Sequence, residues 1–301
     1  RIHREVDEYN LKESTTYSKP PSNKLIRLLY APIKAAQAPT SNIRLLLNSL
    51  KINEYGRDAL SLQAFYMVLS FDLRDYDLIF CHFGPNGNIG ALIRRSGIEV
   101  NLVTMFHGND VRSAVNRYGN GYAPAFEESD MLLVNSKFNK KKLIGLGADS
   151  EKIRVHPIAI DTRKFQCPNN KRRRDYDKVI ITTVGRLVEE KGHKFALEAI
   201  DEASQRTQYD IEYRLIGSGP LESDLRRQAR RLGLEETVIF CGQRSRSGVI
   251  DELCQSDIFL LPSVDEGFGT VLLEAQSCQL PIVATRTGGI PEAVDNNSSF
   301  L

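Results

Sequence analysis

The sequence has no excess of charge of one sign, no long hydrophobic run and no closely spaced cysteine pair. Its 40 Lys and Arg nearly balance 38 Asp and Glu, so no overall field favours nucleic acid as a partner. Mean hydropathy is −0.31, and the longest apolar runs, such as residues 258–262, have the length of a strand. A membrane-spanning helix needs about 18 apolar residues. The sequence therefore predicts neither a nucleic-acid-binding protein nor a membrane-spanning one.

The cysteines are odd in number and form no CxxC pair. They are Cys81, Cys167, Cys241, Cys254 and Cys278. This spacing predicts neither a disulfide framework nor a thiolate zinc site. We therefore expect a protein of the reducing cytoplasm.

The length of 301 residues and the hydrophobic content of 41% suit about two domains with apolar cores and exclude global disorder. The chain begins with Arg1 rather than Met, and its last two residues, Phe300 and Leu301, follow directly on the polar residues 296–299. We therefore expect a fragment that is truncated at both ends.

Short β-rich segments alternate with helical patterns in the second half of the chain. Strands are expected at residues 178–184, 211–216, 237–241, 257–261 and 281–285. Nearly continuous apolar strands joined by helices are typical of a parallel sheet covered on both faces. This half is predicted to be a doubly wound α/β domain.

The first half repeats the pattern, with strands expected at residues 77–83, 100–106, 131–135 and 153–156. We expect two Rossmann-like domains, residues 1–157 and 178–301, joined by the polar linker 158–177. Prolines interrupt any long element in the first 40 residues, to which no structure is assigned.

In an open parallel sheet the ligand lies beyond the carboxyl ends of the strands. The DxD sequences at residues 75–77 and 175–177 each precede a strand, so we interpret them as solvated turns and not as metal sites. Gly217 and Gly219 do follow a strand, but Glu222 stands at the third position of the dinucleotide fingerprint. A close backbone turn is favoured there over a nicotinamide site, which disfavours an oxidoreductase.

Residues 185–193 form a glycine-flanked strand-to-helix loop with two cations, Arg186 and Lys191. A planar guanidinium and a compact ammonium could clamp a diphosphate and offset its charge as a nucleotide leaves. The alternative is a solvated turn in which these cations pair with Glu189 and Glu190.

Glu266 lies in the loop after the strand at 257–261, and Glu274 lies in the next helix with seven residues between them. This separation does not suit the acid and base of a hydrolase, so each is expected to hold a different part of one ligand. Between them, Gly267, Phe268, Gly269 and Thr270 offer backbone N–H groups at a helix start. The alternative is that Glu266 caps the helix and that Glu274 lies on the solvent-exposed face of this helix.

These motifs resemble the retaining family 4 glycosyltransferases of the GT-B fold, in particular those that build exopolysaccharides. The resemblance covers nearly the whole chain. It rests on residues 185–187, 191–192, 217–219, 266–274, 281–285 and 288–292, with 81–84 and 104–110 in the first half.

The resemblance implies that Arg186 and Lys191 bind the donor diphosphate and that Glu274 binds the ribose. Glu266 and residues 267–270 would hold the donor sugar, and His107 would reach it across a cleft. His107 and Glu266 are thus the expected catalytic residues, and the resemblance implies that neither a metal nor a cofactor is needed. On the acceptor side, the resemblance implies three further residues, His82, Gly84 and Asp110.

Relative to that family, the chain lacks an initial strand with its Gly-rich loop and a helix that returns to the first domain. Gln279 also stands where the family has a small residue.

A histidine at a strand end is often only a hydrogen-bonded core residue, and this alternative stays open for His82 and His107. A solvated face is the default interpretation for the lysines within residues 137–142, with docking to a lipid surface as the alternative. The arginines within residues 226–231 are expected to face solvent.

The leading hypothesis is a cytoplasmic retaining glycosyltransferase, peripheral at the inner face of a membrane where its acceptor is lipid-linked. It would move a sugar from a nucleoside diphosphate to a glycan or lipid-linked acceptor in exopolysaccharide or cell-surface polysaccharide synthesis. The alternative is a non-catalytic module that binds a nucleotide sugar.

Overall fold

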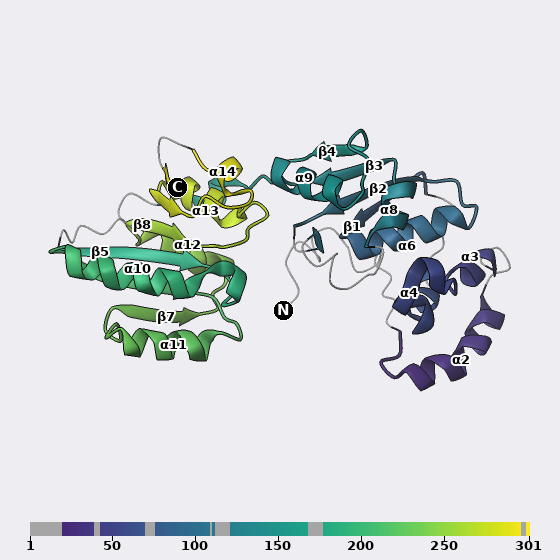
Figure 1. Cartoon of the computed structure of the whole chain (residues 1–301), viewed down its shortest axis with the longest axis horizontal. Helices are drawn as coiled ribbons and strands as arrows, with labels where there is room; N and C mark the ends of the chain where they lie inside the picture. The colour runs from purple at the N-terminus through teal and green to yellow at the C-terminus, as the bar shows by residue number, and fades with distance from the viewer. Residues whose placement is uncertain are drawn as a thin grey trace. The chain divides into compact units, whose positions relative to one another are not determined.

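The computed structural model describes residues 20–38, 43–69, 76–108, 110–111, 121–167, 177–295 and 299–301 (Figure 1). These residues form two compact units. The first contains the chain as far as Val134 together with Lys140–Arg154. The second contains Asn135–Asn139 and the chain from Val155 onward.

The first unit is built on a parallel sheet in the order β1-β2-β3-β4. Its strands are β1 (Leu78–His82), β2 (Asn101–Phe106), β3 (Met131–Val134) and β4 (Ile153–Val155). The helices that follow β1, β2 and β3 are α6 (Gly84–Arg95), α8 (Ala123–Glu128) and α9 (Lys137–Gly145). The four strands expected in the first half are thus confirmed, each within two residues at either end.

Helix α6 lies unusually close to β2 because two of its residues are glycines. A Cβ on Gly87 would lie 2.6 Å from Thr104, and a Cβ on Gly90 would lie 2.5 Å from Leu102. Helix α6 begins directly after the carboxyl end of β1, where the predicted acceptor-side residues lie, and this close packing fixes it against β2.

Among the residues that the structure describes before β1, four helices are present: α2 (Lys24–Gln37), α3 (Ile43–Asn48), α4 (Ile52–Leu60) and α5 (Gln63–Val68). Their apolar residues form a core with α6. Helix α2 continues through Pro32, although prolines were expected to prevent a long element here. Asn23 caps it by accepting a hydrogen bond from the N–H of Leu25 (2.8 Å). One proline costs a helix about 3 kcal/mol, which cap and core contacts offset.

The second unit is a doubly wound sheet in the order β10-β9-β8-β5-β6-β7. Its strands are β5 (Lys178–Val184), β6 (Asp210–Ile216), β7 (Val238–Gly242), β8 (Ile258–Leu261), β9 (Ile282–Ala284) and β10 (Ser299–Phe300). Neighbouring strands of this sheet pair in parallel. The five strands expected in this half and their helical connections are confirmed, and the fold class with them.

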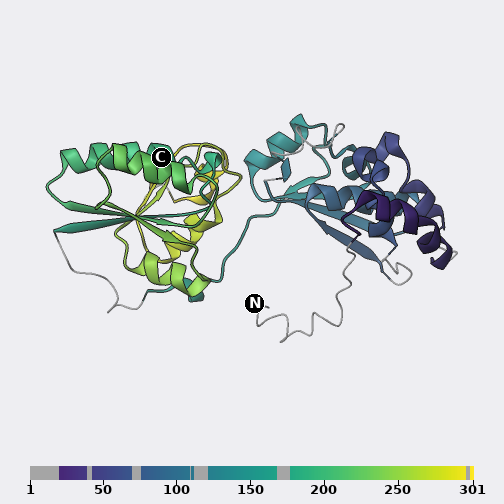
Figure 2. The same ribbon diagram turned by 90° about the horizontal axis from the view of Figure 1, so that it is seen from below.

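Helices cover both faces of this second sheet (Figure 2). On one face, α10 (His193–Arg206) and α11 (Glu222–Arg231) contribute to one apolar cluster. On the other face, α12 (Arg246–Cys254) and α13 (Thr270–Ser277) contribute to a second cluster, with α14 (Ile290–Ala293) beside them. Within the described residues, no helix is long and apolar enough to cross a membrane.

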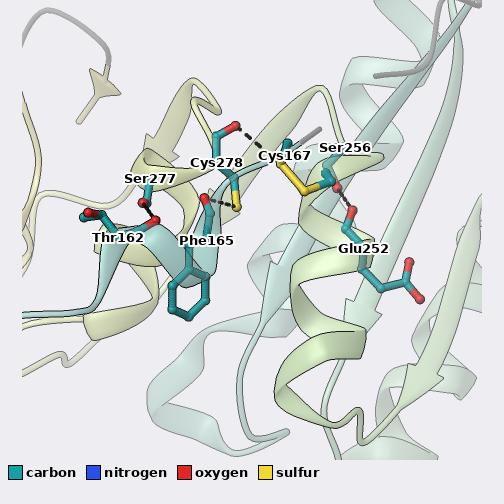
Figure 3. Close-up of a disulfide and its surroundings, with 8 residues drawn as sticks. Thr162, Phe165, Cys167, Glu252, Ser256, Ser277 and Cys278 are labelled. Carbon is teal, nitrogen blue, oxygen red and sulfur yellow. Dashed lines mark hydrogen bonds between the residues drawn. A yellow bond between two sulfur atoms is a disulfide. The ribbon is translucent and has the colours of Figure 1, made fainter. Parts of the chain in front are cut away.

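The sequence predicted no disulfide framework, and this prediction was wrong for one pair of cysteines. Cys167 and Cys254 form a disulfide with a Cα–Cα distance of 5.3 Å, although 87 positions separate them in the sequence (Figure 3). Cys167 follows the short 3-10 helix η2 (Thr162–Phe165), which packs against α13. Tertiary packing brings these two cysteines together, so their spacing along the chain carried no signal.

Candidate active site

The sheet order of the second unit reverses between β5 and β8. These two strands are neighbours, with Ile181 opposite Ile258, whereas β6, the next strand along the chain, lies on the other side of β5. In open α/β sheets such a switch point opens a crevice at the carboxyl ends of the strands, where ligands bind. The two loops at this point are residues 185–192 after β5 and 262–269 after β8. They are the loops in which the sequence predicted the donor-binding residues.

Lys191 and Glu266, one from each of these loops, form an ion pair. Their side chains are only 18% and 11% exposed, so the pair is largely withdrawn from water. Ser263 Oγ also lies 3.5 Å from the same carboxylate oxygen of Glu266. Lys191 had been assigned to the diphosphate and Glu266 to the sugar, with no contact expected between them. In the described structure each neutralises the other.

Arg186 is held far more loosely. One guanidinium nitrogen lies 3.4 Å from a carboxylate oxygen of Glu190, and its side chain is 62% exposed. An exposed pair at this distance contributes little, so the guanidinium is available to a ligand. The solvated-turn alternative thus holds for the Arg186–Glu190 contact but not for Lys191.

His193 was missed by the sequence analysis. It is buried at the start of α10, and its Nε2 lies 2.8 Å from the carbonyl oxygen of Arg186. Burial lowers the pKa of His193, which the hydrogen bond partly opposes. The neutral ring, with Nε2 protonated, can therefore donate to this carbonyl and fix the backbone of the cationic loop. Its position directly after the Lys-Gly pair was the available signal.

The start of α13 presents unused donors. Its N-cap is Gly269, with φ of 83° and no side-chain cap. Among the hydrogen bonds between described residues, none uses the backbone N–H groups of residues 267–271 as donors. Together with the helix dipole, these groups form a site that favours an anion or a sugar hydroxyl oxygen.

The loop before α13 is positioned by a glycine pair after β9. A Cβ on Gly288 would lie 1.9 Å from the carbonyl oxygen of Glu266, and the N–H of Gly289 donates to that oxygen (2.9 Å). Only glycine permits this approach. Farther along the same motif, the Glu292 carboxylate accepts the N–H groups of Lys137 and Phe138 (2.7 and 2.9 Å), within the same compact unit.

Glu274 lies half-buried on α13, one helical turn beyond this site. Burial raises the pKa of its carboxyl group, and the positive charge of Arg246 acts in the opposite direction. No N–H or O–H group of a described residue donates a hydrogen bond to this carboxylate. It therefore keeps its capacity to accept hydrogen bonds from hydroxyl groups of a ligand.

Gly217 and Gly219 serve packing in the described structure. A Cβ on Gly217 would lie 1.9 Å from the carbonyl oxygen of Gly185, and one on Gly219 would lie 2.4 Å from that of Leu187. The turn after β6 thus supports the cationic loop after β5, which agrees with the interpretation favoured from the sequence.

In the first unit, the two predicted histidines are in contact. His82 ends β1, His107 follows β2, and His82 Nδ1 lies 2.9 Å from His107 Nε2. One ring must carry the shared proton while the other accepts it. Burial lowers the pKa of His107, Asp110 opposes this shift, and His82 adds to it. His107 is thus set to be neutral near pH 7.

Asp110 is buried and holds two backbone segments together. Its carboxylate accepts the N–H of Gly84 (3.0 Å) and the N–H of His107 (2.9 Å). Two predicted acceptor-side residues, Gly84 and Asp110, thus position the histidine pair at the strand ends. Phe83, with φ of 71°, lies beside the His107 ring with 4.5 Å between ring centroids.

The predicted site residues therefore form two groups. The first unit holds His82, Gly84, His107 and Asp110, and the second holds the donor-binding residues and Glu266. Asp77 and Asp177 directly precede β1 and β5, at the opposite end of the strands, as expected for turn residues. The other aspartates of these DxD sequences, at positions 75 and 175, lie outside the described residues.

Comparison with known proteins agrees with this division. Residues 168–301 match the family "Glycosyl transferases group 1", and residues 42–164 match "Glycosyltransferase Family 4". The chain is 30% identical over 315 aligned positions to the amylovoran biosynthesis glycosyltransferase AmsK of Erwinia amylovora, covering 99% of this chain and 75% of that protein. The chain belongs to the family 4 glycosyltransferases. It is an enzyme of the glycosyltransferase class, as the motifs predicted.

Other relatives agree with this assignment. The chain is 32% identical to the putative colanic acid biosynthesis glycosyltransferase WcaL of Escherichia coli (strain K12), covering 83% of this chain and 64% of that protein. Among solved structures, HepE of Anabaena in complex with UDP and glucose matches with a TM-score of 0.66 at 22% identity, covering 82% of this chain and 68% of that chain. Sucrose-phosphate synthase from Thermosynechococcus elongatus matches with a TM-score of 0.63 at 21% identity, covering 81% and 64%. These likenesses show the GT-B fold.

Proposed function

We propose that this family 4 glycosyltransferase transfers a sugar, with retention of configuration, from a nucleoside diphosphate sugar to a glycan or lipid-linked acceptor in exopolysaccharide or cell-surface polysaccharide synthesis. The Lys191–Glu266 ion pair at the switch point carries the proposal. The adjoining loops add an exposed arginine and, at the start of α13, backbone N–H groups that donate to no described residue. This set offers cations to a diphosphate and a carboxylate to sugar hydroxyl groups in one place.

The diphosphate would displace the carboxylate of Glu266 from Lys191 and recruit Arg186. Both cations then stabilise the negative charge that develops on the leaving diphosphate, so no metal ion is needed for departure. Glu266, released from Lys191, would accept hydrogen bonds from the donor sugar, and Glu274 would accept them from the ribose. AmsK is named for amylovoran biosynthesis and WcaL for colanic acid biosynthesis, and the structure of HepE contains UDP and glucose, which makes UDP-glucose the first donor to test.

In the transfer step, the acceptor oxygen forms a bond to the anomeric carbon while the bond from that carbon to the phosphate oxygen breaks. Both events occur on one face of the sugar, and the acceptor proton passes to the leaving phosphate oxygen. In this proposal Glu266 accepts hydrogen bonds from hydroxyl groups of the sugar, and Glu274, half-buried on α13, accepts them from the ribose, so neither carboxylate is assigned as the nucleophile of a double displacement. The neutral His107 would donate to the sugar without adding a charge.

A lipid-linked acceptor would suit the outer face of α2. Leu25, Leu28, Leu29 and Ile33 are between 52% and 71% exposed, whereas Arg27 is buried and Ala31 and Ala35 pack against the core. This helix thus turns its large apolar residues outward, with the exposed Lys24 and Lys34 beside them. Apolar side chains flanked by cations are typical of helices that lie in the interface of an anionic membrane.

Helix α9 is less suited to that role. Lys140 Nζ donates to the carbonyl oxygen of Ile153 (3.2 Å), and this hydrogen bond holds the Lys140 side chain against the first unit. We therefore assign membrane contact to α2 and a structural or solvated role to the lysines of α9.

The proposal is tested by titrating the protein with UDP, UDP-glucose and GDP-mannose and then measuring sugar transfer to lipid-linked glycans in vesicles. We expect micromolar to millimolar binding of one nucleotide sugar, and turnover that retains the anomeric configuration. Binding without turnover on any acceptor would favour the non-catalytic module. An inverted product would overturn the single-face mechanism.

Vesicle binding tests α2 separately. Replacing Leu28 and Leu29 with Ser should reduce co-sedimentation with anionic vesicles while nucleotide binding stays unchanged. Equal co-sedimentation of this variant and the parent protein would contradict the membrane role of α2.

A further inference from the structure

Three cysteine sulfurs converge at one point of the second unit, away from the donor-binding loops. The Sγ atoms of Cys167, Cys254 and Cys278 all lie within 4.8 Å of one another (Figure 3). Each comes from a different segment: Cys167 follows η2, Cys254 ends α12 and Cys278 follows α13. Two of them are joined in the described structure, and Cys278 is a free thiol.

The segments that carry these sulfurs are held independently of the disulfide. Ser277 Oγ donates to the carbonyl oxygen of Thr162 (3.3 Å), and Cys278 Sγ lies 3.5 Å from that of Phe165. Phe165 is fully buried in the same apolar cluster as Cys254 and Cys278. The three cysteines would therefore stay together after the Cys167–Cys254 bond is opened.

We propose that the reduced form of this cluster is a metal site in which Cys167, Cys254 and Cys278 bind one thiophilic divalent ion of the Zn²⁺ class. A dithiol reductant supplies the two electrons and two protons that convert the disulfide into two thiols, and is itself oxidised to a disulfide. The ion then replaces the protons of three thiols, which are released to water.

The geometry suits such an ion. Zn–S bonds of about 2.3 Å place the sulfurs of a tetrahedral site about 3.8 Å apart. The Cα atoms of Cys167 and Cys254 are 5.3 Å apart, so a rotation of their side chains separates the two sulfurs to that distance without moving the backbone. Cys167 is only partly buried, which leaves a path for the ion and a position for water as the fourth ligand.

The electrostatics favour a cation over free thiolates. Cys254 and Cys278 lie at the carboxyl ends of α12 and α13, where the helix dipole is negative. A bound cation is favoured at these helix ends and stabilises the deprotonated sulfurs that coordinate it.

The proposal goes beyond sugar transfer and can be tested without activity. The protein reduced with a phosphine is titrated with Cd²⁺, whose bonds to thiolates absorb in the ultraviolet. We expect one Cd²⁺ per chain, at least ten-fold weaker binding in Cys278→Ser, and unchanged binding in Cys241→Ser, which removes a thiol on β7 outside the cluster. Protein with the Cys167–Cys254 bond intact should bind no Cd²⁺ through thiolates.

Alkylation read by mass spectrometry gives a second readout on the unaltered reduced protein. Zn²⁺ should slow the alkylation of Cys167, Cys254 and Cys278 together and leave that of Cys241 unchanged. Equal alkylation with and without Zn²⁺, or equal Cd²⁺ affinity in Cys278→Ser and the parent protein, would overturn the proposal.

Discussion

Replacing Glu266 with Gln should tighten the binding of the bare nucleoside diphosphate while it lowers turnover. In the described structure the carboxylate of Glu266 competes with the diphosphate for Lys191, in a pair whose side chains are 18% and 11% exposed. The amide keeps the size of the side chain and removes the competing charge. The sugar, in contrast, loses its charged hydrogen-bond acceptor, so transfer slows.

The magnitude follows from the pair itself. A hydrogen bond between charged groups contributes about 1.5–3 kcal/mol, and the amide at position 266 would retain part of it as a neutral acceptor. If about 1.4 kcal/mol of competition is removed, the affinity for UDP rises about ten-fold. Isothermal titration calorimetry of UDP with the parent protein and E266Q measures this change directly.

A double-mutant cycle assigns the gain to Lys191. K191M and the double variant K191M/E266Q should bind UDP with equal affinity, because no ammonium is left to be released. Glu190→Gln is the matched control, since the contact between Glu190 and Arg186 is long and exposed and its loss should change affinity less than two-fold. Weaker UDP binding in E266Q, or a gain that persists without Lys191, would refute the competition between Glu266 and the diphosphate.

Three further predictions address other parts of the site. Glu274→Gln should weaken UDP about ten-fold or more in calorimetry, because a charged hydrogen bond to a ribose hydroxyl is lost; an unchanged affinity would place the ribose elsewhere. Burial holds the pKa of His193 below that of the unfolded chain, so folding stability should fall as pH drops below about 6.5 and level off below the folded pKa. In thermal unfolding, H193Q should lack this loss of stability at low pH, and identical pH profiles of H193Q and the parent protein would contradict the prediction. EDTA should leave turnover intact, including in Cys278→Ser, whereas loss of activity restored by Mn²⁺ would reveal a catalytic metal.

Local sequence determined the elements and the end of the sheet at which chemistry occurs. The range 178–184 expected for a strand is that of β5, because its apolar β-branched residues lie between polar turn residues. The placement of Arg186 and Glu266 in loops after strands followed from the same pattern, since a residue that follows a parallel strand lies at its carboxyl end.

Contacts between distant segments were decided only by the tertiary structure. Lys191 and Glu266 are 75 positions apart, and they meet because β8 pairs with β5. Strand order is a property of the whole sheet, and no periodicity within a segment encodes it. The same reason explains why the contact between His82 and His107 could not be derived from two separate strand ends.

The disulfide and the backbone contacts of Asp110 were likewise decided only by the tertiary structure. Cys167 and Cys254 carry no spacing signal, because η2 and α12 are placed by the core between them. The sequence assigned Asp110 to the acceptor side, and only the fold shows that its carboxylate accepts the N–H groups of Gly84 and His107. A sequence specifies which side chain can accept a hydrogen bond, whereas the folded backbone determines which donors lie within reach.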